Sequence, residues 1–394
     1  MVTLNWLFAS GPELSNWIGK LIYLMYQAIG NYGWTVVVFT ICLKVLVSPL
    51  DIWQKKVTRK NNIAMKRMEA PLAKLREAYA DNPQQLQRKQ QELNKQYGYS
   101  MLGACLPSLI TMVVFFVIFS GFNATVKYVN QMIVYDLSTS YKELVIDTGL
   151  IDGKIDNLYS EEYSSAYNTL VSYGIDLEQY RGRTEFTDEE VDNLIDSVML
   201  SAYDAHSVND DGSKKWKWLW VDNVFMGDSW ADTVPTLETY VGSGLGKLNS
   251  SLPDANFRVR SKYNSNIYDA LMGPAQKTYN KTKTFDIKNW NGFLVLPILS
   301  IALSIISTKL LGANTPQQNT TYDKNGKPVD GQSAQAQMKM MNWIMPIMIG
   351  VFSLFYSAAF TIYMFFNSLI SVIFNLIYNA VTKKKDKAIL ESIK

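Results

Sequence analysis

The feature that most constrains this chain is a run of 43 residues, Met340 to Thr382, that contains no charged side chain. One crossing of a lipid bilayer takes about 20 apolar residues, so a run of this length predicts two consecutive membrane spans. Further apolar stretches lie at 33–50, 101–122 and 293–311. A segment inside lipid must satisfy its backbone hydrogen bonds internally, which favours helices. We therefore expect an all-α polytopic membrane protein.

Five predicted transmembrane helices divide the chain into membrane and loop segments. The predicted spans are 33–50, 101–122, 293–311, 341–357 and 359–381. The segments between and beside them are an amphipathic interfacial helix in 1–32, a helical hairpin in 51–100, an extracellular region in 123–292, a disordered loop in 312–340 and a short basic tail in 382–394. For 1–32 the alternative is a signal peptide, but the segment has no basic start.

The distribution of charge predicts the orientation of these spans. Segment 51–100 carries eleven Lys or Arg and five acidic residues, whereas 122–292 carries 16 basic and 25 acidic residues. Basic loops remain on the cytoplasmic side of a membrane, so 51–100 and the Lys-rich tail are expected inside and 122–292 outside. With five spans, the N-terminus is then outside and the C-terminus is cytoplasmic.

Several residue types that common chemistries need are scarce. Cys42 and Cys105 both lie in apolar stretches, and His206 is the only histidine. These counts exclude a disulfide framework, a Cys-based zinc site and Ser/His/Asp or Cys/His catalysis in the membrane part. The sequence also lacks a GxxxxGK[ST] phosphate-binding loop. We expect no enzymatic activity, no cofactor, no metal and no binding of nucleic acid.

One charged residue, Lys44, lies inside the first predicted span. A charge near the centre of a bilayer costs about 2.5–3.5 kcal/mol on insertion scales, so this lysine is expected to be compensated. One interpretation is that its long side chain reaches the inner headgroups. The other is that it lies in a hydrated cavity between helices.

Polar residues on four of the spans favour the cavity. The residues, most of them four apart, are Thr40, Lys44 and Ser48, then Ser108 and Thr111, then Ser300, Ser304 and Thr308, and finally Asn367, Ser371 and Asn375. Any one such stripe is also compatible with simple helix–helix contact. Four together favour a shared hydrophilic groove around a single positive charge. With no carboxylate in any span, that groove suits the passage of a polar or acidic segment better than ion-coupled transport.

The basic segment 51–100 carries an apolar stripe at helical spacing. Its members are Met65, Met68, Leu72, Leu75 and Tyr79. The stripe is explained either by two helices packed against each other or by a cytoplasmic surface on which a partner docks. These interpretations are compatible with each other.

The ordered motifs resemble the YidC/Oxa/Alb family of membrane protein insertases, in its five-span bacterial form. The motifs are Tyr32-Gly33-Trp34 followed by 40–50, then 65–79, Gly103 to Ile110, Leu296-Pro297-Ile298-Leu299, Met345-Pro346-Ile347-Met348, and Tyr363 with Asn367 and Ser371. This sequence departs from the family at Lys44, where arginine is usual, at Thr111, where glutamine is common, and at Met364, where tryptophan is common. The segment 136–215 looks like an insertion into the family pattern.

The resemblance implies a groove, open to the cytoplasm and to lipid, that receives hydrophobic segments with short polar or acidic flanks and releases them into a bacterial plasma membrane. Lys44 takes the place of the family's basic residue. The implied partners are nascent membrane proteins, the lipid bilayer, the Sec translocon, the signal recognition particle pathway and the ribosome, although the short tail argues against strong ribosome binding. The alternatives are a small-solute transporter or channel, and a structural or receptor protein centred on the extracellular region.

Overall fold

A computed structural model gives the fold of this protein. The described residues are 12–79, 82–99, 101–242, 245, 248, 258–264, 266–280, 290–312, 350–353 and 356–391. Within them every regular element is a helix, and β-structure is limited to two isolated bridges, Val208 with Lys214 and Trp218 with Val221. The all-α fold class predicted from the sequence is therefore confirmed for this part of the chain.

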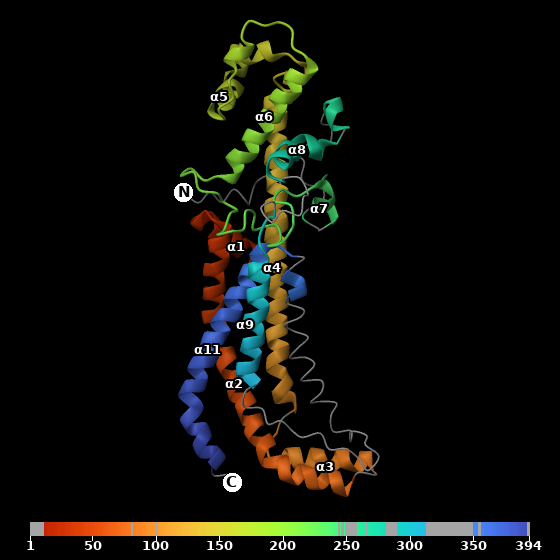
Figure 1. Ribbon diagram of the computed structural model, residues 1–394, viewed down its shortest axis with the longest axis vertical. Helices are drawn as coiled ribbons and strands as arrows, with labels where there is room; N and C mark the ends of the chain where they lie inside the picture. Colours follow the sequence, from red (N-terminus) through yellow and green to blue (C-terminus); the bar gives the residue numbers. More distant parts are fainter. Residues whose placement is uncertain are drawn as a thin grey trace. The chain divides into compact units, whose positions relative to one another are not determined.

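The helices follow the chain in a simple order (Figure 1). The α-helices are α1 (Trp17–Ile29), α2 (Tyr32–Ala78), α3 (Pro83–Gln96), α4 (Met101–Tyr141), α5 (Ser164–Ser172), α6 (Asp188–Ser207), α7 (Leu237–Gly242), α8 (Ile267–Tyr279), α9 (Val295–Gly312) and α11 (Ala358–Glu391). A π-helical turn, Lys142–Ile146, follows α4, and short 3₁₀ turns lie at Leu150–Asp152, Ile155–Tyr159, Glu161–Tyr163, Glu178–Tyr180 and Ser261–Tyr263.

The chain forms two compact units, each described here by itself. Unit 1 contains Met1–Val36, Ile118–Val295 and Leu354–Phe360, and unit 2 contains Val37–Val117, Leu296–Ser353 and Thr361–Lys394. Unit 1 holds α1 and the elements α5 to α8. Unit 2 holds α3 and most of α2, α9 and α11.

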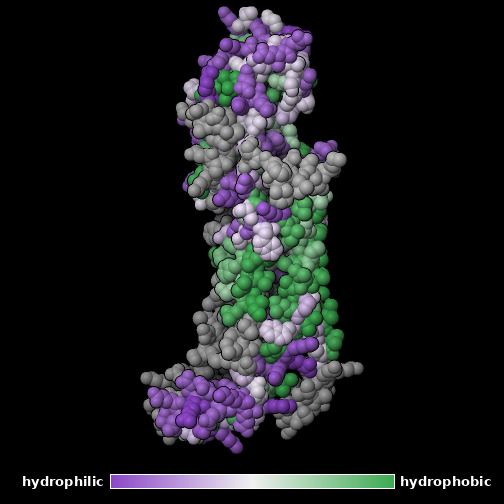
Figure 2. All heavy atoms as spheres, turned by 180° about the vertical axis from the view of Figure 1, so that it is seen from behind, coloured by the Kyte–Doolittle hydropathy of each residue, from purple (hydrophilic) through white to green (hydrophobic). Residues whose placement is uncertain are grey.

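Among the residues that the structure describes, three helices are long and apolar enough to cross a membrane: Tyr32–Ala78, Met112–Ile146 and Ala358–Thr382. Val295–Ser307 is a shorter apolar helix. The surface of the protein carries wide hydrophobic areas (Figure 2). In unit 2, exposed apolar side chains include Ile41, Val45, Leu46, Leu109, Val113, Phe116, Ile298, Ile306, Leu376, Ile377 and Val381. Soluble monomers rarely expose so much contiguous apolar surface, whereas a lipid-facing helix must.

The helices are longer than the apolar runs that predicted them. The helix α2 extends 28 residues beyond the predicted span end at residue 50, to Ala78. The helix α4 continues past residue 122 to Tyr141, so it enters the segment 136–215 that was interpreted as an insertion. Beyond residue 50, α2 carries many Lys, Arg and Gln side chains, which are good helix formers, and its backbone therefore stays helical where hydropathy falls. The extension of α4 remains largely apolar, and Met112–Ile146 as a whole is apolar enough to cross a membrane.

In unit 1, helix α1 packs closely against α4 because both helices present glycine at the contact. A Cβ atom added to Gly121 of α4 would lie 2.3 Å from the Ile18 Cγ2 atom of α1. The Thr125 hydroxyl donates hydrogen bonds to the Gly121 and Gly19 carbonyls at 2.9 and 3.3 Å. On α1, Ile18 and Ile22 are buried, whereas Trp17 is exposed. Leu21 and Leu24 are exposed as well, so apolar residues lie on both the buried and the exposed sides of this helix, and its placement at a membrane interface stays a prediction.

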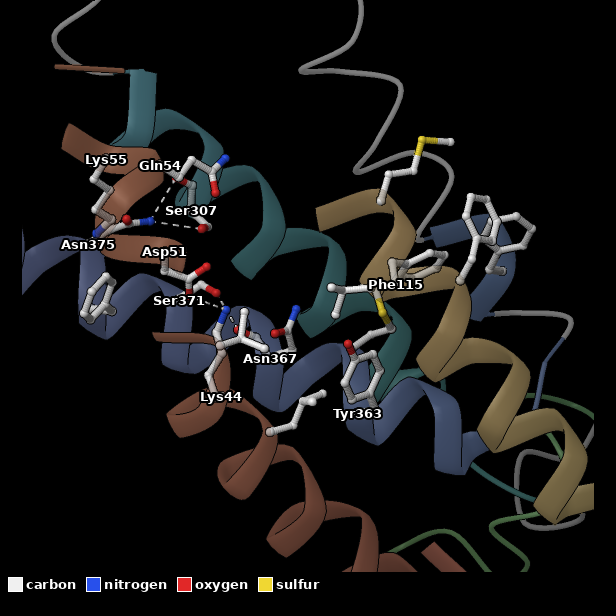
Figure 3. A pocket seen from close by; sticks show the side chains of 18 residues that line it. Lys44, Asp51, Gln54, Lys55, Phe115, Ser307, Tyr363, Asn367, Ser371 and Asn375 are labelled. Carbon is white, nitrogen blue, oxygen red and sulfur yellow. Dashed lines mark hydrogen bonds and ion pairs between the residues drawn. The ribbon is translucent and has the colours of Figure 1, made fainter. Parts of the chain in front are cut away.

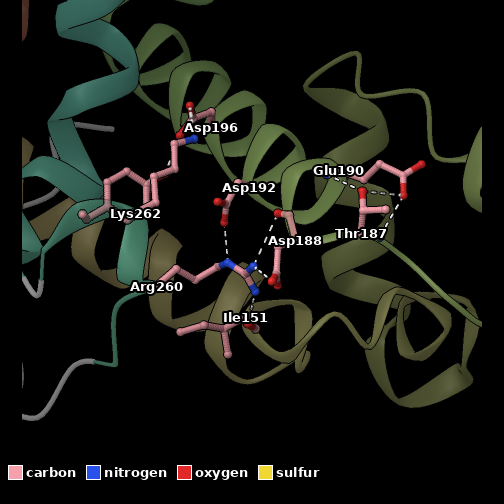
Figure 4. A network of polar contacts seen from close by, with 9 residues as sticks. Ile151, Thr187, Asp188, Glu190, Asp192, Asp196, Arg260 and Lys262 are labelled. Carbon is pink, nitrogen blue, oxygen red and sulfur yellow. Dashed lines mark hydrogen bonds and ion pairs between the residues drawn. The ribbon is translucent and has the colours of Figure 1, made fainter.

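Helix α6 is stabilised by a capped N-terminus and by ion pairs of its acidic face (Figure 4). Its N-cap, Thr187, forms a reciprocal capping box with Glu190. Further along, Asp188 and Asp192 receive hydrogen bonds from the guanidinium of Arg260, which also donates to the Ile151 carbonyl at 2.9 Å. Acidic residues spaced four apart on α6 therefore face a basic segment before α8, and α6 packs along α8.

The same contacts shift the acid–base equilibria of α6. Burial opposes ionisation of Asp196, but hydrogen bonds from Lys262 and Tyr263 outweigh that effect and lower the pKa of the carboxyl. Burial likewise opposes the charge of Arg260, but the hydrogen bonds to Asp188 and Asp192 outweigh it and raise the guanidinium pKa. At neutral pH these groups are therefore ionised, and the network is charged.

Parts of the predicted organisation lie outside the described residues. These parts are the start of the interfacial segment, 1–11, the whole of the loop 313–340, and the predicted span 341–357 up to residue 349. Of that span, residues 350–353 are helical.

Candidate functional site

Unit 2 contains a pocket of about 260 Å³ between its helices (Figure 3). Its lining comes from α2, α4, α9, α11 and Phe352. A few tens of Å³ suffice for a water molecule, so this volume accommodates several. The pocket is therefore large enough to hold water among helices whose outer faces are apolar.

Three ionisable residues of the pocket come from one face of α2. Lys44, Asp51 and Lys55 are separated by seven and four residues, which at about 100° per residue places them within about 40° of one another. The Lys44 ammonium forms an ion pair with the Asp51 carboxylate at 3.0 Å, and the two side chains are 16% and 19% exposed. The prediction of a groove with a single positive charge and no carboxylate is therefore wrong. The Asp51 carboxylate, about two helical turns after Lys44, compensates the charge of Lys44.

The second lysine, Lys55, has different surroundings. Its residue is only 7% exposed, and its Nζ atom has no hydrogen-bond partner among the described residues. The ammonium lies 4.1 Å from the ring centroid of Phe374 and 4.8 Å from that of Tyr378, both on α11. The cation is thus stabilised by aromatic faces on one side, while its donors are not used by another side chain of the described part.

Helix α11 supplies the uncharged polar groups of the pocket. Asn367, Ser371 and Asn375 all line it, as their spacing of four residues indicates. The Asn375 side-chain amide donates to the Ser307 hydroxyl of α9 at 3.1 Å. The Ser371 hydroxyl donates to the Asn367 carbonyl of its own helix at 2.7 Å. The amide of Asn375 thus ties α9 to α11 while Asn367 borders the cavity.

The pocket changes character along its length (Figure 3). Lys55, Gln54 and Asn375 lie toward one end of it, whereas Phe115 and Tyr363 lie toward the other. One end of the pocket is therefore lined by an ammonium and amides, and the other end by aromatic rings.

Several residues predicted for the groove do not line this pocket. Thr40, Ser300 and Ser304 are buried elsewhere, and the Ser48 hydroxyl donates to the Val45 carbonyl of its own helix at 2.8 Å. The side chains of Ser108, Thr111 and Thr308 lie outside the described part of the structure. The stripe predicted Ser48 in the groove, but Ser48 is not among the residues that line this pocket.

The pocket also contains residues that the sequence analysis did not select. These residues are Asp51, Gln54, Lys55 and Ser307. The helical spacing of Asp51 and Lys55 indicates their position, because residues seven and eleven positions after Lys44 lie on the same face of a helix. It was overlooked because the hairpin was assumed to begin at residue 51, which separated Asp51 and Lys55 from the span.

The apolar stripe of the hairpin is largely buried. Met65, Met68 and Leu72 are less than a tenth exposed, whereas Leu75 and Tyr79 are half-buried. Leu86 of α3 is buried as well. Packing between helices accounts for this burial, and docking of a partner on the hairpin stays a prediction.

Comparison with known proteins identifies a family for most of the chain. The sequence model of the 60Kd inner membrane protein family matches residues 24–153 and 263–386. These segments include every element that lines the pocket. The unmatched stretch is 154–262, which overlaps the segment 136–215 interpreted as an insertion but begins and ends later.

Individual relatives are matched over shorter regions. The membrane protein insertase YidC of Helicobacter pylori is 34% identical over 102 residues, which is 25% of this chain and 17% of the relative. The proteins of the same name from Leptospira interrogans and Prosthecochloris aestuarii are 32% identical over 124 residues (31% of this chain, 19% of the relative) and 26% identical over 145 residues (37% and 24%). The chain thus covers about a fifth of the length of these curated relatives. No solved structure matches it significantly.

Proposed function

Because the chain belongs to the 60Kd inner membrane protein family, which includes the YidC insertases, we propose that it is a membrane protein insertase. Its passengers are hydrophobic segments with short polar or acidic flanks, and its partners are nascent membrane proteins, with or without the Sec translocon. The protein is a multi-pass membrane protein. We further propose five spans in a bacterial plasma membrane, with the N-terminus outside and the C-terminus cytoplasmic.

The observation that carries this proposal is the charged pocket between apolar helices. Two ammonium groups and one carboxylate, all on α2, leave the pocket one net positive charge. Water, amides and this charge shorten the hydrocarbon barrier that a polar flank must cross. The step needs no nucleotide, because moving the passenger's apolar helix into lipid provides the driving free energy.

The proposed roles of the groove residues follow from where they lie. Lys44 and its partner Asp51 lie in the middle of the pocket, with Asn367 and Ser371 beside them in Figure 3. We propose that Asn367, Ser371 and Asn375 keep this space hydrated. Ser108 and Thr111 on α4 remain candidates for the same role.

Reconstitution tests the insertase activity directly. The purified protein would be placed in liposomes, and insertion of a single-span protein with an acidic translocated tail would be measured by protection of the tail from protease. We expect wild type and Lys44→Arg to insert the passenger. We expect Lys44→Leu to insert it about tenfold less, because this change leaves the Asp51 carboxylate unpaired in the passenger's path.

Insertion no better than in empty liposomes would contradict the proposal. A flux of small solutes through the same vesicles, without insertion, would favour the transporter. Loss of insertion only when 154–262 is deleted, with Lys44→Leu unaffected, would favour a protein centred on its extracellular region.

A further inference from the structure

The charges of the pocket are not equivalent. Lys44 and Asp51 neutralise each other at 3.0 Å, so neither is available to a visiting group without breaking an ion pair. Lys55 has no carboxylate partner in the salt bridges of the described residues, and its Nζ atom lacks a hydrogen-bond acceptor there. The Asp51 carboxylate, one helical turn before Lys55, also attracts its ammonium electrostatically, but forms its ion pair with Lys44. The positive charge that the pocket can offer without breaking an ion pair is therefore that of Lys55.

The surroundings of Lys55 restrict what can approach it. An ammonium has three donors and no acceptor, and burial of an ammonium without acceptors is costly. The rings of Phe374 and Tyr378 cover part of it and hold it in place. The remaining donors border the pocket, where Gln54 contributes a side-chain amide. A fixed ammonium next to an amide is complementary to a carboxylate, which accepts hydrogen bonds from both.

We infer that Lys55 is the residue in this groove that binds a carboxylate of the passenger segment, whereas the Lys44–Asp51 pair is a neutral, polar part of the wall. The inference rests on the proposed insertase function and adds a specificity-determining residue to it. At about 1.5 Å per residue, Lys55 lies roughly 16 Å along α2 from Lys44. The acidic group of a passenger is therefore received at the polar end of the pocket.

The experiment compares passengers that differ only in the charge of the translocated tail. Proteoliposomes of zwitterionic lipid would be given single-span passengers with zero, one or two aspartates in an otherwise identical tail. We expect Lys55→Gln to reduce the preference for the acidic passengers about tenfold relative to the neutral one, as expected for loss of one charge-assisted hydrogen bond. Lys55→Arg keeps the charge and the aromatic contact, and it should retain the preference.

Two further variants make the assignment specific. Lys56→Leu removes the neighbouring lysine, which is exposed and does not line the pocket, and it should leave the preference unchanged. The double variant Lys44→Leu/Asp51→Leu removes the ion pair without changing the net charge, and it should also retain the preference for acidic tails. Loss of the preference in this double variant but not in Lys55→Gln would assign the carboxylate to Lys44 and overturn the inference.

Other outcomes separate this inference from the proposed function. If wild type inserts no passenger, the insertase proposal itself fails. If wild type inserts all passengers and Lys55→Gln keeps the wild-type ratio between them, only the role of Lys55 is wrong. A parallel series adds anionic lipid to the vesicles. If the effect of Lys55→Gln follows the content of anionic lipid in this series instead of the number of aspartates, the ammonium binds a lipid phosphate and the carboxylate assignment is overturned.

Discussion

Arg260 connects three segments of unit 1 through one side chain. Its guanidinium donates to Asp192 and Asp188 of α6 and to the Ile151 carbonyl, and the side chain is only 15% exposed. We expect Arg260→Ala to lower the opening free energy of the α6 amides by about 2–3 kcal/mol, because it leaves Asp192 buried without its partner. Hydrogen exchange on the full chain measures this quantity.

A matched control is the exposed pair Arg181 with Glu178, whose side chains are about 60% exposed. Exposed pairs contribute about 0–1 kcal/mol, so Arg181→Ala should change α6 little. Equal losses from Arg181→Ala and Arg260→Ala would show that Arg260 does not hold α6. Arg260→Lys should lower the opening free energy of the α6 amides by an amount between those of Arg181→Ala and Arg260→Ala, because lysine keeps the charge but cannot reproduce the forked geometry of the guanidinium.

How far individual site residues could be predicted depended on where the first span was thought to end. Lys44 and Asn367 were found from composition and spacing because they are polar residues inside apolar runs. Asp51 and Lys55 were missed, although they follow the same helical periodicity, since hydropathy marks a change of solvent and not the end of a helix. The contact of Lys55 with α11 could not be predicted, because no local pattern says which helices pack together.

At the scale of the element, the close contact between α1 and α4 depends on Gly121 having no side chain. A Cβ atom at Gly121 would overlap Ile18, so Gly121→Ala should loosen α1 by about 1–3 kcal/mol through overpacking. Alanine favours the helix more than glycine, and α4 itself should not be weakened. Hydrogen exchange of the α1 amides measures the effect.

Two companion variants test this explanation. Ile18→Ala combined with Gly121→Ala should restore much of the protection of α1, because it makes room for the added methyl group. Gly273→Ala in α8 places its Cβ atom in open space, so it should leave α8 as stable or slightly more stable. Exchange of α1 that does not change in Gly121→Ala would mean that the two helices are not held by this contact.

The sequence pattern predicted the apolar part of each membrane helix but not where the helix ends. Apolar runs located the cores of α2, α4, α9 and α11. They did not reveal that α2 continues as a single helix through polar sequence, since Lys, Arg, Gln and Glu maintain helices as well as apolar residues do. They also did not reveal that α4 continues to Tyr141. The α6 network joins residues about 70 positions apart, and such contacts cannot be predicted from local sequence patterns.

At the scale of the whole molecule, the orientation in the membrane is the property that single-cysteine labelling can test. In a background with Cys42→Ala and Cys105→Ala, the exposed positions Arg181 and Arg88 would each be changed to cysteine. We expect an impermeant maleimide to label Arg181→Cys in intact cells and Arg88→Cys only after permeabilisation, because basic segments stay inside. The reverse pattern would mean an inverted topology.

The pocket charges all lie on α2, whereas the aromatic rings that cover Lys55 lie on α11, and this division has a consequence for motion. Lys44 and Asp51 belong to one helix, so they travel together and their ion pair survives any separation of α2 from its neighbours. The aromatic cover of Lys55 belongs to α11, so a separation of α2 from α11 uncovers its ammonium. The width of the groove and the charge that it presents are thereby coupled: a narrow groove hides its cation, and a widened groove displays it.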